Sequence, residues 1–252
     1  MDLIGGITSK ATARPRIFPS LCDWLDDAVP IDWLVDFLQL IHDTPNLDWL
    51  LLTKRPENFF DRIRLARNHG LKQSLPVIPG WCYMTSRWIN KGAKAPSNVW
   101  IGVSTENQAM ADKRIPQLLK IPAKLHFLSV EPMLDAIDLD TYLLPSLEDA
   151  QKAYRGVDCD WPRIHWIIVG GESGPRARQC ETDWIRDVIG QCKTASVPCF
   201  VKQIGRHPGW NDKEMDERWY ERLSHPKGGD MSEWPEDLRV REFPKEHHDQ
   251  PS

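Results

Sequence analysis

Short hydrophobic runs alternate with amphipathic segments along most of the chain. Six runs contain almost only hydrophobic residues, at positions 17–21, 47–53, 98–104, 125–130, 165–170 and 199–203. Such unbroken runs are typical of strands that are buried on both faces of a parallel sheet, whereas a strand with one solvated face alternates. We therefore expect these six runs to form adjacent parallel strands of one sheet.

Segments with helical spacing separate these runs, at 31–43, 56–70, 106–121 and 181–195. Pro56 and Gly70 mark the two ends of the second helix. Pro116 predicts a kink or a break in the third. Strand and helix alternate about every 30 residues, which predicts βα units and an α/β fold with a parallel sheet. We expect residues 1–204 to form a partial, TIM-like (β/α) barrel.

Three other segments do not fit the strand–helix repeat. The connections 71–97 and 136–164 are longer than a helix requires, and loops of that length usually carry function or form lids. Beyond residue 204 the chain is polar, and its tryptophans stand among proline, glycine and charged residues. We expect residues 205–252 to be an irregular C-terminal extension that wraps the barrel.

The composition is that of an ordinary soluble globular protein. The 252 residues are 41% hydrophobic and 27% charged, with a net charge of −4. This mildly acidic balance does not indicate nucleic acid as a partner, although it leaves nucleic-acid binding open. No run approaches the roughly 20 apolar residues of a membrane span, and the first residues lack the apolar core of a secretory signal. We expect a cytoplasmic protein that does not enter a membrane.

The cysteines do not form a ligand motif. They stand at positions 22, 82, 159, 180, 192 and 199, without any C-x-x-C pair. Zinc sites and iron–sulfur clusters usually take thiolates at short spacing, so we predict no metal ligands. We expect free thiols in or near the core, with Cys192 along a helix and Cys199 at the start of a strand, opposite the expected site. Cys22 alone should lie near that site.

Polar residues follow each predicted strand. In barrels and open α/β sheets the ligand site lies at the carboxyl ends of the strands. The expected binding residues are therefore Asp23, Lys54, Ser104, Glu106, Ser129, Glu131, Gly170, Gly171, Glu172 and Lys202. We expect the carboxylates of Glu106, Glu131 and Glu172 to face one cavity within reach of Lys54 or Lys202. The alternative is a set of solvated turns and structural ion pairs, and no catalytic residue is identified.

The most informative segment is HWIIVGGESGPRARQC, residues 165–180. Two glycines directly after a buried strand let a ligand approach the backbone, and their N–H groups can hold an anion. Arg176 and Arg178 could then bind a carboxylate or a phosphate. The alternative is a tight turn with surface arginines. In the next most informative segment, LSVEPML, Pro132 fixes Glu131 in an extended conformation.

Three long segments closely resemble an uncharacterised family of phage and bacterial proteins. They are NVWIGVSTENQAMADKRIPQLLKIPAKLHFLSVEPML, HWIIVGGESGPRARQCETDWIRDVIGQCKTASVPCFVKQIG and KGGDMSEWPEDLRVREFP, and the resemblance extends from about Arg14 to Pro244. Members of this family look like radical S-adenosylmethionine (SAM) enzymes with a partial (β/α) barrel. Their N-terminal segment usually carries cysteines suited to a 4Fe–4S cluster, and some are encoded beside a three-Cys-motif partner protein.

This chain departs from the family pattern in the N-terminal segment. The usual cysteines would lie before the first strand, where only sixteen residues precede Ile17. The resemblance therefore implies an N-terminally truncated barrel that lacks its own cluster and is inactive alone. It also implies that Ser104 and Glu106 hold the cofactor ribose, and that Gly170, Gly171 and Glu172 line the base or the substrate. We expect no 4Fe–4S cluster and no SAM cleavage by this chain alone, but weak SAM binding.

Two other functional classes remain open. A metal-dependent barrel hydrolase would need histidines at strand ends, but the sequence has no H-x-H on a predicted strand, and His126 and His165 lie inside or before strands. A non-catalytic module that binds nucleic acid or a protein partner could use the twelve tryptophans and the basic clusters at 14–17, 54–56 and 62–67. The same tryptophans could equally pack helices against the barrel wall.

Overall fold

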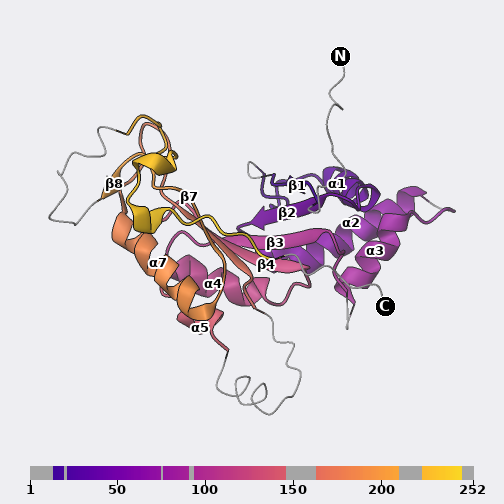
Figure 1. Ribbon diagram of the computed structural model, residues 1–252. Helices are drawn as coiled ribbons and strands as arrows, with labels where there is room; N and C mark the ends of the chain where they lie inside the picture. The colour runs from indigo at the N-terminus through magenta and orange to yellow at the C-terminus, as the bar shows by residue number, and fades with distance from the viewer. Residues whose placement is uncertain are drawn as a thin grey trace, which may run out of the picture.

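The centre of the molecule is one curled sheet of six parallel strands (Figure 1). The computed structural model describes residues 14–19, 22–74, 76–90, 94–145, 163–209 and 223–245. The strands, in spatial order, are β1 (Arg16–Ile17), β2 (Asp48–Thr53), β3 (Val99–Ser104), β4 (Leu125–Val130), β5 (Trp166–Gly170) and β7 (Cys199–Gln203). Spatial order follows chain order, so the prediction of six adjacent parallel strands is confirmed. The sheet forms a half-barrel.

The first strand is shorter than its hydrophobic run. β1 ends at Ile17, whereas the run continues to residue 21. Pro15 and Pro19 flank the strand, and proline has no N–H group to donate to a sheet. Residues 20–21 lie outside the described residues. The other five strands begin within one residue of the predicted position and end where predicted.

The helices are α1 (Ile31–Asp43), α2 (Phe59–Ser74), α3 (Gly80–Ile89), α4 (Gln108–Leu118), α5 (Asp140–Leu143) and α7 (Thr182–Ala195). Three details differ from the sequence-based expectation. A 3₁₀ turn at Pro56–Asn58 precedes α2, which passes through Gly70. The ring of Trp81 packs directly on that glycine and leaves no room for a Cβ atom. The connection 71–97 contains α3. The third predicted helix corresponds to α4, which continues past Pro116 to Leu118 and is not broken at the proline.

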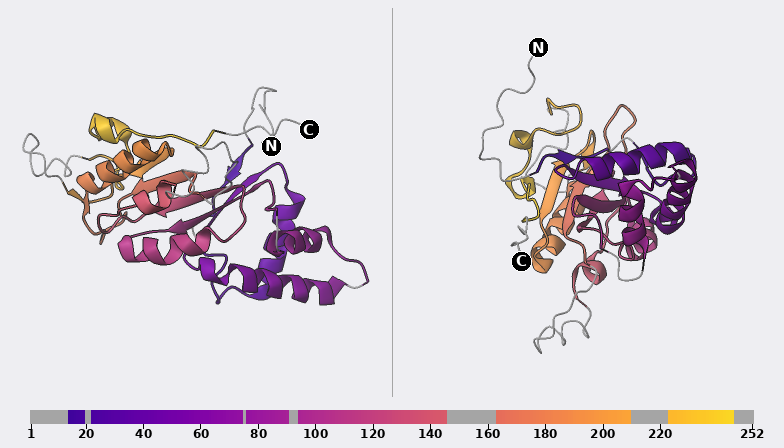
Figure 2. Two further views of the ribbon diagram at one scale, coloured as in Figure 1. Left: turned by 90° about the horizontal axis from the view of Figure 1, so that it is seen from below. Right: turned by 90° about the vertical axis from the view of Figure 1, so that its right-hand side faces the viewer.

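The sheet has an outer face and a concave face, because successive strand residues point to opposite sides. Outer-face residues such as Leu51, Ile101 and Leu128 belong to one large core with the helices, which cover this side (Figure 2). The concave face holds a separate, mostly aromatic group, here called the concave cluster: Leu50, Trp100, Phe127, Trp166 and Ile168. These side chains fill the inside of the half-barrel, as in other small barrels.

The chain near its C-terminus covers the free edge of β7. Residues 239–245, here called the C-terminal strap, run antiparallel to it, with bonds from Val201 N to Val240 O (2.8 Å) and from Glu242 N to Cys199 O (2.8 Å). Phe243 then packs on Trp166, with ring centres 5.4 Å apart. The guanidinium group of Arg16 lies 5.3 Å from the Phe243 ring. The strap thus connects the last strand of the sheet to the first.

Two β-bridged segments, β6 (Cys180–Glu181) and β8 (Pro208–Gly209), form a small second sheet. The 3₁₀ turns Met231–Glu233 and Glu236–Leu238 complete the described elements. Within the part of the chain that the structure describes, no helix is both long and apolar enough to cross a bilayer. Several expectations concern residues outside the described ranges: the N-terminal segment, most of the connection 136–164, Cys159, Trp210 and Trp219.

Candidate functional site

The carboxyl ends of the strands carry three groups of paired charges, here called the carboxyl-edge site. The first group joins Lys54, which follows β2, to Glu106 and to Arg114 of α4. Lys54 Nζ lies 2.8 Å from Glu106 Oε1, and Arg114 Nη1 lies 2.6 Å from Glu106 Oε2. Arg114 also donates a hydrogen bond to the carbonyl oxygen of Ser104 (2.8 Å). The glutamate and the arginine side chains are each only 11% exposed, whereas Lys54 is 50% exposed.

The charge of Glu106 is stabilised by its neighbours. Burial alone would raise the pKa of this carboxyl group, but the hydrogen bond from Lys54 and the positive charge of Arg114 outweigh burial and lower the pKa below its usual 4.5. Glu106 is therefore ionised at neutral pH. It holds a lysine and an arginine at fixed positions on the edge of the sheet.

The second group lies between β4 and β7. Lys202 Nζ lies 3.0 Å from Glu131 Oε2, and the amide of Gln203 donates to Glu131 Oε1 (3.1 Å) and to the carbonyl oxygen of Gly171 (2.9 Å). Lys202 was one of the two lysines expected near the glutamates. Gln203, which is buried, links the glutamate to the backbone of the loop after β5.

The third group is formed by Glu172 and Arg178. The arginine side chain donates to both carboxylate oxygens at 2.8 Å, and its backbone N–H donates to Oε2 at 2.8 Å. These bonds lower the pKa of Glu172 to about 2. Arg178 was expected to bind a ligand anion, and Glu172 was expected beside a lysine. Instead, the two side chains bind one another. The charge of Glu106 also contributes to raising the pKa of Arg178, so the first and third groups interact.

Asp23 fixes the corner between β1 and β2. Its carboxylate accepts hydrogen bonds from the hydroxyl of Thr53 (2.6 Å) and from the backbone N–H of Lys54 (2.9 Å). The guanidinium group of Arg55 lies 3.5 Å away. With these partners, Asp23 positions the backbone that carries Lys54.

Two serines lie side by side on the concave face, one step closer to the carboxyl edge than the concave cluster. Ser104 of β3 pairs in register with Ser129 of β4, after the pair formed by Gly102 and Phe127. They are 2% and 3% exposed. Among the described residues, neither serine hydroxyl has a hydrogen-bond partner. The hydroxyl of Thr105 is fully buried without a partner, whereas the two serine hydroxyls retain some accessibility. The two serine hydroxyls are therefore available to bind a ligand or water.

The glycines after β5 allow a close approach of backbone rather than of a ligand. A Cβ atom on Gly171 would lie 2.5 Å from the carbonyl oxygen of Ile204 and 2.8 Å from the Cα of Gly205. The N–H of Gly171 donates to the carbonyl oxygen of Gln203 (3.1 Å). The expected anion site on this N–H group is therefore taken by the chain itself. Gly170 lies beside the second charged group, because a Cβ atom on it would be 3.4 Å from Glu131 Oε1.

The structure thus places Lys54 with Glu106, Lys202 with Glu131, and Ser104 with Ser129, as polar groups of one edge. Sequence reasoning missed Arg114 and Thr53. Arg114 belongs to a helix whose charged residues resemble an ordinary solvated face, and no sequence signal marks the one that turns inward. Thr53 is the last residue of β2, and a polar residue that ends a buried strand is a signal that could have been used.

The described cysteines do not fit a 4Fe–4S cluster, which requires several thiolates that converge. Cys22 is exposed, whereas Cys82, Cys180, Cys192 and Cys199 are buried in different elements. Cys192 lies in α7 and Cys199 begins β7, as predicted, at the edge opposite the carboxyl-edge site. Over the described ranges, no group of three or more histidine, cysteine, aspartate or glutamate residues is suited to a metal ion.

Comparison with known proteins gives one match. A family model described as "Protein of unknown function (DUF5131)" matches residues 7–237. Neither the search of curated proteins nor the search of solved structures found a match.

Proposed function

The chain belongs to the DUF5131 family, and we propose that its carboxyl-edge site binds SAM, a nucleoside that carries an amino-acid group. The observation that carries this proposal is the combination of paired charges with two serine hydroxyls on the concave face that have no hydrogen-bond partner among the described residues. The sequence resemblance to radical SAM enzymes independently suggests the same ligand.

The charges favour a zwitterion over a polyanion. Lys54, Arg114, Lys202 and Arg178 each lie within 3.0 Å of a carboxylate oxygen of Glu106, Glu131 or Glu172. A triphosphate would be repelled by these carboxylates. An amino-acid group can instead place its carboxylate beside an exposed lysine and its ammonium group beside a glutamate. The same pairing disfavours nucleic acid, which needs cations that are not already neutralised.

The serines supply the second part of the proposal. Hydroxyl groups that have no partner within the described chain are available to hydrogen-bond a ribose, which offers both donors and acceptors. Ser104 lies between the concave cluster and Glu106, so one ligand can contact the hydroxyl and the charged pair together. The described cysteines do not fit an iron–sulfur cluster. We therefore propose binding and assign no cluster-dependent chemistry to these residues.

Isothermal titration calorimetry with SAM, adenosine and ATP tests this proposal on the full chain. We expect one SAM per chain, with adenosine and ATP at least tenfold weaker. The double variant Ser104→Ala/Ser129→Ala should bind SAM about thirtyfold more weakly, because it loses two hydrogen bonds and each is worth about 1 kcal/mol. Ser86→Ala, in α3, is the matched control and should bind normally.

The proposal is wrong if the full chain does not bind SAM at millimolar concentration, or if ATP binds more tightly than SAM. Equal binding by the double variant and the control would remove the serines from the site. Thermal unfolding of each variant shows whether the fold is intact. We expect no loss of stability in the double variant, because the hydroxyls have no partners to lose among the described residues.

A further inference from the structure

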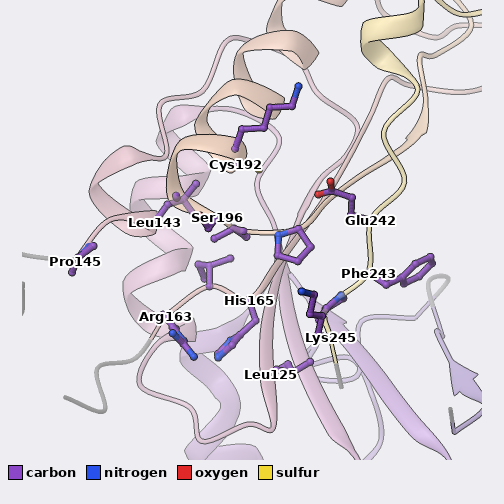
Figure 3. A pocket seen from close by; sticks show the side chains of 16 residues that line it. Leu125, Leu143, Pro145, Arg163, His165, Cys192, Ser196, Glu242, Phe243 and Lys245 are labelled. Carbon is purple, nitrogen blue, oxygen red and sulfur yellow. The ribbon is translucent and has the colours of Figure 1, made fainter. Parts of the chain in front are cut away.

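A second hollow opens at the opposite edge of the sheet, where the strands begin (Figure 3). It has a volume of about 870 Å³, a size typical of small-molecule sites. It lies between the starts of β4, β5 and β7, the end of α7 and the C-terminal strap. Its apolar wall is formed by Leu125, Leu143, Ile164, Val197, Pro198 and Phe243. We call it the amino-edge cavity.

Positive charges are in excess around this cavity. Arg163, Lys193 and Lys245 line it, and Glu242 is the one acidic residue in the lining. Glu242 is already engaged, because its Oε2 accepts a hydrogen bond from the backbone N–H of Cys199 (3.2 Å). The carboxyl-edge site, in contrast, pairs its lysines and arginines with carboxylates.

Ser196 adds an independent observation. It caps the C-terminus of α7 with a φ of 55°, and it is the one non-glycine residue with positive φ in the described part of the chain. Glycine is the usual residue at this cap, since any other side chain is strained there. Ser196 nevertheless lines the cavity with a side chain that bears a hydroxyl group (Figure 3). Strained positions of this kind often serve function. Ser196 and the three cations thus place hydrogen-bond donors around an apolar wall.

From this arrangement we propose that the amino-edge cavity binds an organic anion, a molecule with an aromatic or aliphatic body and one phosphate or carboxylate group. The body would pack on Val197, Pro198 and Leu125. The anionic group would take donors from Arg163, Lys245 and Ser196. Because this cavity lies at the edge opposite the carboxyl-edge site, it can bind its ligand whether or not SAM binds.

Fluorescence or calorimetric titration with 1-naphthyl phosphate tests the proposal, with 1-naphthol, inorganic phosphate and 1-naphthoate as comparison ligands. We expect 1-naphthyl phosphate or 1-naphthoate to bind at one site per chain, and the comparison between them identifies the preferred anion. Naphthol lacks the charge and inorganic phosphate lacks the apolar body, so each should bind at least tenfold more weakly. Equal binding of naphthol and both anions, or no binding of either anion, would overturn the proposal.

Variants locate the site. Arg163→Gln/Lys245→Gln should weaken binding of the preferred anion at least tenfold, whereas Lys72→Gln, in α2, should not change it. Ser196→Gly should weaken binding severalfold while the melting temperature stays equal or rises, because glycine relieves the strain at φ 55°. Unchanged affinity in both the double variant and Ser196→Gly would show that the anion binds elsewhere.

Discussion

Charged side chains are arranged differently at the two edges of the sheet. At the carboxyl edge, Glu106 is bound by Lys54 and Arg114, and Glu131 is bound by Lys202, within 3.0 Å in each case. At the amino edge, three lysine or arginine residues surround a cavity that is lined by a single glutamate. The first edge is neutralised by its own side chains, and the second keeps an excess of cations.

This difference teaches that one small sheet can hold two kinds of recognition surface. Paired charges at the carboxyl edge are held in place by contacts within the chain, so they suit a ligand with both signs of charge. An excess of cations suits an anion, and cations without a carboxylate partner among the described residues contribute less to the stability of the protein. Substitutions of the paired charges at the carboxyl edge should therefore affect folding, whereas substitutions at the amino edge should affect mainly binding.

The largest effect is expected at Gly171. An alanine there would place its Cβ 2.5 Å from the backbone oxygen of Ile204, which cannot move without displacing the strand connection. We expect Gly171→Ala to lower the free energy of unfolding by about 3 kcal/mol, measured by urea denaturation. Gly190→Ala in α7 is the control. Its Cβ would meet nothing within 4 Å, so it should stabilise the protein by about 0.5–1 kcal/mol.

The next effect concerns Glu106. Replacing it by glutamine leaves the mostly buried guanidinium group of Arg114 without a counter-charge, so Glu106→Gln should cost about 2 kcal/mol of unfolding free energy. Glu172→Gln, which breaks the exposed pair with Arg178, should cost much less. Equal losses in the two variants would show that burial does not separate these pairs.

The stabilising effect of Glu106 should also depend on pH. The pKa of Glu106 is lower in the folded protein than its usual 4.5, so its contribution is present at neutral pH and is lost as the pH falls through the folded-state pKa. The difference in unfolding free energy between the wild type and Glu106→Gln should therefore be constant above about pH 5 and shrink at lower pH. A difference that grows on acidification would contradict this assignment.

The smallest effect is expected at the amino edge. Glu242→Gln removes the acidic residue from the cavity lining, and the glutamine oxygen can still accept the hydrogen bond from Cys199 N. We expect the unfolding free energy to stay within about 0.5 kcal/mol of the wild type. The affinity for 1-naphthyl phosphate should rise about threefold, as expected for one screened charge near the site. A weaker affinity would mean that the excess of cations does not drive binding.

The sequence predicted the sheet well because β2, β3, β4 and β5 are almost entirely buried on both faces and so appear as unbroken apolar runs. It failed at α3, where Pro79 and Gly80 suggested a loop. The spacing of Trp81, Thr85 and Trp88 on one helical face was the available signal, and these residues are buried in the structure. The presence of polar and charged side chains at the carboxyl edge could also be predicted, because ligand sites in such folds lie at the carboxyl ends of the strands.

The pairing of those residues could not be predicted. Arg178 binds Glu172 because the turn between them brings the two groups together, and this geometry is absent from residue spacing. The amino-edge cavity was missed altogether. Arg163, Ser196 and Lys245 come from separate segments of the chain, and only the folded arrangement brings them around one hollow.

The C-terminal strap limits where another strand can be added to the sheet. An exposed strand edge is a template on which another strand can add, from a partner or from a second copy of the chain. Backbone bonds from the strap already occupy the edge of β7, so strand addition is blocked there. Any strand that extends the half-barrel must therefore add at a position other than the β7 edge.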